Sequence, residues 1–69
     1  METTENGLDG LDIGNRHMVG AMGQTIVVIN PPKQLTPDQA LVFAAWLVAL
    51  AEYQASVKFE DVLAKVQNT

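Results

Sequence analysis

A run of twelve apolar residues, from Ala40 to Ala51, constrains the fold of this chain more than any other feature. Within "QALVFAAWLVALAE", residues 39–52, apolar side chains occupy every side of the predicted helix. A helix that is apolar all round is normally buried all round. The run is nevertheless shorter than the ~20 residues needed to cross a bilayer. The sequence therefore predicts a soluble protein whose central helix is covered by other protein surface.

The chain is too short to cover such a helix easily. Its 69 residues form one domain at most, and a domain of this size hides only about 60% of the surface that its unfolded form exposes. Small proteins compensate with disulfides, a metal or a partner subunit. Cysteine is absent and His17 is the only histidine. We therefore expect no disulfide, no metal and no cofactor, and association with a second copy becomes the expected stabiliser.

The charge balance excludes some partners. Four basic residues stand against eight acidic ones, which gives a net charge of −4. Nucleic-acid-binding modules carry a basic patch or stripe, whereas the basic residues here are scattered. The N-terminus lacks the basic start and the apolar stretch of a signal peptide. We expect a cytoplasmic protein that binds neither nucleic acid nor membranes.

The first twelve residues differ from the rest of the chain. Gly7-Leu8-Asp9 is repeated as Gly10-Leu11-Asp12, but the spacing is not that of a calcium-binding loop. We interpret residues 1–12 as a flexible tail and residues 13–69 as a single small domain.

Residues 13–30 have the pattern of a β-hairpin. The second arm, "TIVVI" at residues 25–29, is almost wholly β-branched, which favours a strand over a helix. The first arm covers about residues 16–22 and is interrupted by Gly20. Both faces of the second arm are apolar, so each face needs a cover.

The turn between the arms fixes the predicted register. Gly23-Gln24 fits a two-residue type II′ turn, in which glycine supplies a positive φ at the first position. The resulting pairs are Met22 with Thr25, Val19 with Val28, and His17 with Asn30.

The start of the central helix is the clearest local signal. Thr36 is a favourable N-cap, and Pro37 suits the first helical position, where its missing N–H has no consequence. Gln39, three residues after Thr36, completes a capping box. Asp38 complements the positive end of the helix dipole. We predict a helix from Pro37 to about Gln54.

Two sides of this helix differ in the size of their side chains. One side carries a bulky stripe that we expect to pack on the hairpin, formed by Phe43, Trp46, Leu47 and Leu50. The opposite side is rich in alanine, and small side chains allow a second helix to approach to 8–10 Å. We expect two copies to meet on this side. The candidate interface residues are Leu41, Ala44, Ala45, Trp46 and Val48.

The last element is a short amphipathic helix. Phe59, Val62, Leu63 and Val66 follow the i, i+3, i+4, i+7 spacing of a one-sided apolar helix over about residues 59–67. The predicted fold is α+β: a small β-hairpin, a long buried helix and a short C-terminal helix (ββαα), in a homodimer.

Catalytic signatures are missing from the sequence. Ser56 and His17 are the only serine and histidine, and no nucleophile-elbow motif surrounds the serine. Glu60 and Asp61 are neighbours in a helix and point apart, as expected for a solvated face. The sequence predicts a protein that is not an enzyme.

One polar cluster stands out near the start of the central helix. In the predicted register Arg16 and His17 lie close to Asn30 and Lys33, and the helix capped by Thr36 follows directly. Helix N-termini offer free N–H groups to anions, so these five residues are candidates for a small anion-binding pocket. The alternative is that they are ordinary exposed residues of strand ends and loops.

Taken together, "NRHMVGAMGQTIVVINPP" and "LTPDQALVFAAWLVALAE" resemble a group of small uncharacterised proteins encoded by bacteriophages of actinobacteria. The resemblance covers about residues 13–66 and implies a phage origin and a host cytoplasm. Residues 53–58 depart from it, because a more acidic linker with glycine or aspartate is expected there.

These features lead to three competing functions. The first is a homodimeric interaction module that engages a host protein, because apolar surface is in excess and catalytic groups are missing. The second is a sponge that sequesters a phosphorylated nucleotide signal through the anion pocket. The third is a minor virion component.

Overall fold

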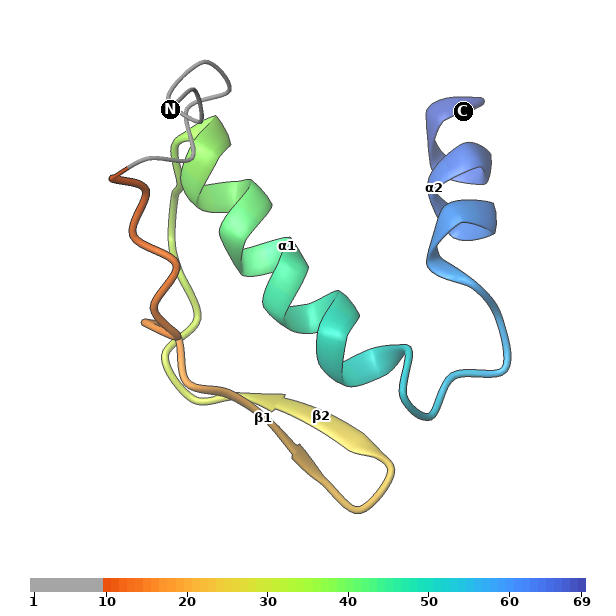
Figure 1. Cartoon of the computed structure of the whole chain (residues 1–69), viewed down its shortest axis with the longest axis horizontal. Helices are drawn as coiled ribbons and strands as arrows, with labels where there is room; N and C mark the ends of the chain where they lie inside the picture. The colour runs from red at the N-terminus through yellow and green to blue at the C-terminus, as the bar shows by residue number, and fades with distance from the viewer. Residues whose placement is uncertain (1–9) are drawn as a thin grey trace.

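Two strands and two helices follow one another along the chain (Figure 1). The computed structural model describes residues 10–69, so most of the predicted tail lies outside the described residues. The elements are β1 (Val19–Met22), β2 (Thr25–Val28), α1 (Pro37–Ala51) and α2 (Phe59–Gln67). This order confirms the predicted α+β fold of ββαα type.

The hairpin has the predicted register. β1 and β2 are antiparallel, and Val19 pairs with Val28 while Met22 pairs with Thr25. Gly23 has a φ of 62°, as required at the first position of a type II′ turn. The observed pairing is the one that the β-branched second arm and the glycine turn predict.

The first strand is shorter than predicted because the backbone turns at Met18. This residue has a φ of 51°, in the left-handed region that side chains other than glycine disfavour. The side chain of Asn15 stabilises the turn, since it donates to the Val19 carbonyl and accepts from the Val19 N–H, both at 2.9 Å. Pairing resumes beyond the turn, where the Asn30 N–H donates to the His17 carbonyl at 3.2 Å.

The helix α1 begins as the sequence predicts. Thr36 is the N-cap, its hydroxyl accepts from the Gln39 N–H, and the Gln39 side chain accepts from the Thr36 N–H. This capping box satisfies two N–H groups that otherwise have no partner at a helix start.

The predicted end of α1 is wrong by three residues, because the helix stops at Ala51 and not at Gln54. A carboxylate at Glu52 is unfavourable at the negative end of the helix dipole, and Tyr53 is 87% exposed, so it has no packing to extend the helix. The Gln54 side chain instead donates to the Gly23 carbonyl at 3.1 Å, which ties the segment after α1 to the hairpin turn.

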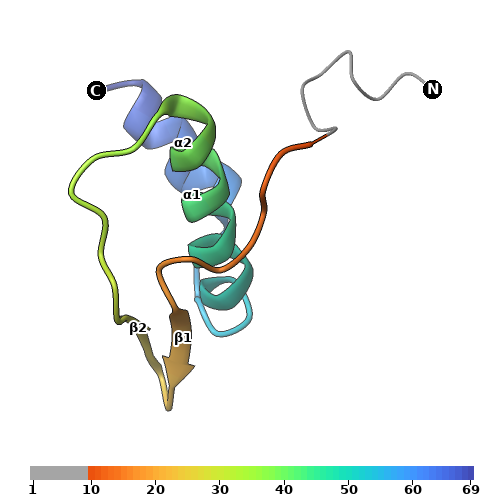
Figure 2. The same ribbon diagram turned by 90° about the vertical axis from the view of Figure 1, so that its left-hand side faces the viewer.

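The helix α1 packs on the hairpin through its bulky stripe. It contacts both strands, and Phe43, Trp46, Leu47 and Leu50 are all half-buried. In Figure 2 the segments before β1 and after β2 pass on either side of α1. Val19, 5% exposed, is the one buried hydrophobic side chain in residues 10–69. The described part of the chain therefore has a very small core.

The last helix covers little of α1. Its bounds, Phe59–Gln67, are those predicted. It follows a linker, residues 52–58, and its four apolar side chains remain 39 to 63% exposed. The Phe59 N–H donates to the Glu52 carboxylate at 3.3 Å, which fixes the start of α2 to the end of α1.

Candidate functional site

A cavity of about 580 Å³ lies between the first half of α1 and the segment that precedes β1. Small-molecule sites commonly measure about 300–1,000 Å³, so the volume suits a small ligand. The lining combines three rings, those of His17, Phe43 and Trp46, with several polar side chains. The other lining residues are Gly10, Leu11, Asp12, Gly14, Asn15, Arg16, Gln34, Leu35, Gln39 and Val42.

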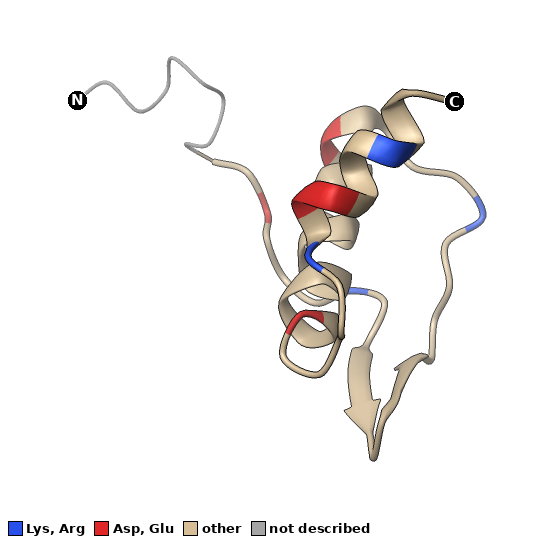
Figure 3. Ribbon diagram, turned by 90° about the vertical axis from the view of Figure 1, so that its right-hand side faces the viewer, with Lys and Arg blue, Asp and Glu red and all other residues tan. Residues whose placement is uncertain are grey.

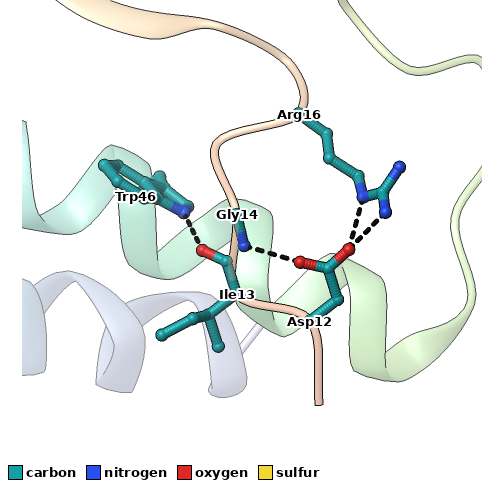
Figure 4. A network of polar contacts seen from close by, with 5 residues as sticks. All are labelled: Asp12, Ile13, Gly14, Arg16 and Trp46. Carbon is teal, nitrogen blue, oxygen red and sulfur yellow. Dashed lines mark hydrogen bonds and ion pairs between the residues drawn. The ribbon is translucent and has the colours of Figure 1, made fainter. Parts of the chain in front are cut away.

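Two contacts hold the segment before β1 against α1. The indole N–H of Trp46 donates to the Ile13 carbonyl at 2.9 Å (Figure 4). The His17 ring meets the Phe43 ring edge-on, with the ring centres 5.1 Å apart and the planes at 77°. Trp46 and Phe43 belong to the bulky stripe of α1, so the same stripe positions the hairpin and builds the cavity.

An ion pair occupies the polar side of the cavity. The Arg16 guanidinium donates through Nε to the Asp12 carboxylate at 2.8 Å and through Nη2 to the same oxygen, and the Gly14 N–H donates to the other oxygen at 2.9 Å (Figure 4). The Gly14 N–H first, and then Arg16, lower the pKa of Asp12 below its usual value of 3.8. The charge of Arg16 is therefore balanced by Asp12 at the cavity.

His17 is held in one orientation by the end of the second arm. Its Nδ1 lies 2.8 Å from the Asn30 carbonyl, and a carbonyl only accepts hydrogen bonds, so Nδ1 carries the proton. In the neutral ring Nε2 is then left as an acceptor. The Asn30 side chain also donates to the Arg16 carbonyl at 3.2 Å. This asparagine therefore holds both the His17 ring and the backbone at Arg16.

The structure brings together only part of the predicted anion pocket. Arg16 and His17 line the cavity, and Asn30 supports His17 from outside it. Lys33 and Thr36 are not among its lining residues, and the Thr36 hydroxyl is already engaged in the capping box. At the cavity, Arg16 and His17 are therefore accompanied by residues 10–15 and by residues 34–46, and not by Lys33 and Thr36.

Asp12 is the residue that the sequence reasoning missed at this site. The sequence places it in the predicted tail, although it precedes Arg16 by four residues and has the opposite charge. The Asp12–Arg16 contact is an i, i+4 ion pair, but the segment is not helical, so spacing alone did not predict it.

A second candidate site is apolar and lies on α1. Leu41 is 70% exposed, and Ala45 and Ala49 are exposed beside it along one side of α1. We call these three residues the outer stripe. Of the other predicted interface residues, Ala44 and Val48 are half-buried, and Trp46 points to its own chain through the Ile13 bond. The exposed apolar side of α1 is therefore narrower than predicted, and it includes Ala49, which the prediction omitted.

A third candidate site is the exposed apolar surface of the hairpin. Met18, Met22 and Ile29 are all exposed there, and we call them the hairpin patch. The two-stranded sheet also leaves one edge of each strand without a β-partner within the described residues.

The charges of the described elements form no basic stripe. In Figure 3 the basic positions fall on separate elements, and α2 carries acidic positions as well as a basic one. Within residues 10–69 no group of three histidine, aspartate or glutamate side chains is placed to hold a metal ion. Neither described helix is long and apolar enough to span a membrane.

Comparison with protein-family models, with curated proteins and with solved structures finds no match for this chain.

Proposed function

We propose that this chain is a small binding protein without catalytic activity, a homodimeric module that engages a second protein. The resemblance of its hairpin and capped helix to phage proteins makes a host protein in the host cytoplasm the proposed target. The observation that carries this proposal is the presence of two separate apolar surfaces, the outer stripe and the hairpin patch, beside so small a core in residues 10–69.

The two surfaces lie on different elements. The outer stripe runs along α1, which packs on the hairpin through its bulky stripe. Exposed apolar patches larger than a few hundred Å² mark interaction sites in most proteins. If a second copy covers the outer stripe, the hairpin patch stays free for a different partner. A module of this kind both associates with itself and binds another protein.

The hairpin patch has the chemistry of an adaptable binding surface. Met18 and Met22 are flexible and polarisable, and exposed methionine side chains adjust to partners of different shape. The free strand edges add backbone N–H and C=O groups that a partner strand can pair with.

Affinity capture with matched variants tests the proposal. Met22→Glu places a charge in the hairpin patch, and Gln24→Glu places the same charge two residues away in the exposed turn. We expect the wild type and Gln24→Glu to retain one host protein that Met22→Glu loses, with all three chains sedimenting as dimers. Equal capture by Met22→Glu would contradict binding through the hairpin patch.

The second candidate function is sequestration of a phosphorylated nucleotide. The cavity volume and the presence of Arg16 and His17 in its lining favour it. The Asp12 carboxylate, which balances Arg16, opposes it, and for this reason we place it second.

Calorimetry with a panel of nucleotides separates the two candidates. If a nucleotide binds the cavity, Arg16→Ala removes a charge-assisted hydrogen bond of about 1.5–3 kcal/mol and reduces affinity tenfold or more. Lys33→Ala is the matched control, because it removes one positive charge outside the cavity lining. Absence of binding to the wild type would exclude nucleotide sequestration.

A further inference from the structure

We propose that the outer stripe of α1 is covered by α2 of a second copy, and that the second copy receives α2 of the first in the same way. The inference rests on the proposed function, because it identifies the surfaces that form the proposed homodimer. It assigns the two helices different roles: α1 supplies a shallow apolar surface, and α2 supplies the side chains that fill it.

The side chains of the two surfaces are complementary in size. The outer stripe has two alanines beside one leucine, Leu41, so a helix can approach it closely. The apolar face of α2 consists of Phe59, Val62, Leu63 and Val66, all large and all partly exposed. Two alanine-rich surfaces facing each other would bury little area, whereas large side chains fill the space above the alanines. A bulky helix is thus the better partner for the outer stripe.

The lengths of the two surfaces also match. At 1.5 Å per residue, the outer stripe from Leu41 to Ala49 extends about 12 Å, and the apolar face of α2 from Phe59 to Val66 extends about 10 Å. The charged side chains of α2 lie off this contact, because Glu60, Asp61 and Lys65 occupy the remaining sides of the helix.

The exposed area is sufficient for a stable dimer. If each large side chain has an area of the order of the ~150–200 Å² of aromatic side chains, complete burial of the exposed fractions of the outer stripe and the α2 face would remove at most roughly 500 Å² per copy. Interfaces are about 60% apolar, so the total contact would reach about 800 Å² per partner, the size of a standard stable interface. Both reciprocal contacts are needed to reach this value, which favours an exchange between two copies.

The chain's own α2 faces a side of α1 that borders the outer stripe. A groove of about 220 Å³ lies there, lined by Leu47, Val48 and Ala51 of α1, by the linker and by Phe59 and Val62 of α2, and no outer-stripe residue lines it. At 3.6 residues per turn, Leu47 lies roughly 120° or more from every outer-stripe residue and Ala51 roughly 80° or more, whereas Val48 lies only about 20° from Leu41. The groove therefore borders the outer stripe without including it. The Glu52–Phe59 and Gln54–Gly23 hydrogen bonds fix the linker to α1 and to the hairpin. The outer stripe is therefore left for a helix of another chain.

Cross-linking of single-cysteine variants tests this arrangement, because the natural chain has no cysteine. Ala45→Cys places one thiol on the outer stripe, and Leu63→Cys places one on the apolar face of α2. Each variant alone, and an equal mixture after subunit exchange, is treated with a short bismaleimide and separated on a denaturing gel. Ser56→Cys, in the exposed linker, replaces Leu63→Cys in a control mixture that measures random collision.

We expect the mixture of Ala45→Cys and Leu63→Cys to give at least fivefold more covalent dimer than either variant alone or the control mixture. Equally strong cross-linking of Ala45→Cys alone would overturn the inference in favour of contact between two α1 helices. A double variant, Ala45→Cys with Leu63→Cys, that closes within one chain would overturn it in favour of the chain's own α2.

Sedimentation of the unmodified wild type separates failure of this inference from failure of the proposed function. A dimer without cross-linking in the mixture would overturn the assigned surfaces and leave the homodimer standing. A monomer at every concentration up to the millimolar range would overturn both.

Discussion

The indole N–H of Trp46 donates to the backbone carbonyl of Ile13 and so joins the middle of α1 to the segment before the hairpin, 33 positions earlier in the chain. We expect Trp46→Phe to lower the free energy of unfolding by about 1 kcal/mol or more, since it removes this bond and part of the packing. Denaturant melts followed by far-ultraviolet circular dichroism measure the change. Tyr53→Phe is the control, because Tyr53 is almost fully exposed and should leave the midpoint unchanged.

The capping box gives a second prediction. Thr36→Ala removes the acceptor of the Gln39 N–H and should lower stability by about 1 kcal/mol. Thr36→Ser keeps the hydroxyl and should retain most of that stability. An unchanged melting midpoint for Thr36→Ala would mean that the cap contributes nothing to the stability of α1.

The left-handed backbone at Met18 predicts a stabilising substitution. Met18→Gly removes the steric penalty of a φ of 51° at a residue with a side chain, and we expect a gain of about 0.5–1 kcal/mol. Met22→Gly, in the extended part of β1, should instead lower stability, because glycine weakens a strand. A loss of stability in both variants would show that the Met18 side chain matters more than its backbone conformation.

The Asp12 ion pair predicts a pH dependence of definite sign. Because the pKa of Asp12 is lowered in the folded chain, its contribution is complete above the pKa of the unfolded chain and is lost as the pH falls through the lower, folded value. Carboxyl-carbon NMR titration measures that value directly. With Arg16→Gln the pKa should rise but stay below 3.8, since the Gly14 N–H is the largest cause of the shift.

A charge on the outer stripe should separate association from folding. Ala45 is exposed in the single chain, so Ala45→Glu has no buried position to disrupt there. In the proposed dimer the same charge would be buried without a partner, at a penalty of several kcal/mol. We expect a monomer by sedimentation that keeps the Trp46–Ile13 contact in NMR spectra. Gln24→Glu carries the same added charge and should remain a dimer.

The elements that the sequence predicted correctly are those specified by neighbouring residues. The register follows from Gly23 and the β-branched arm, the start of α1 follows from Thr36 to Gln39, and the bounds of α2 follow from its apolar spacing. Each signal acts within a few residues along the chain.

The features that were predicted wrongly or missed depend on particular side-chain contacts, some local and some between distant segments. The early end of α1 is linked to the Gln54–Gly23 bond, which joins positions 31 apart. The turn at Met18 depends on the Asn15 side chain, and Asn15 carries no distinctive sequence signal. The cavity lining brings Trp46 of α1 and Asp12 of the segment before β1 to the same cavity, and periodicity describes only one element at a time.

The small core of the described chain has a consequence for how long the protein survives in a cell. With Val19 as its one buried hydrophobic side chain in residues 10–69, we expect an isolated copy to open readily and expose cleavable backbone to proteases. The proposed association would favour the closed form by mass action, to an extent that rises with concentration. Copies without a partner should be degraded first, so the cellular lifetime of the chain would report how much of it is bound.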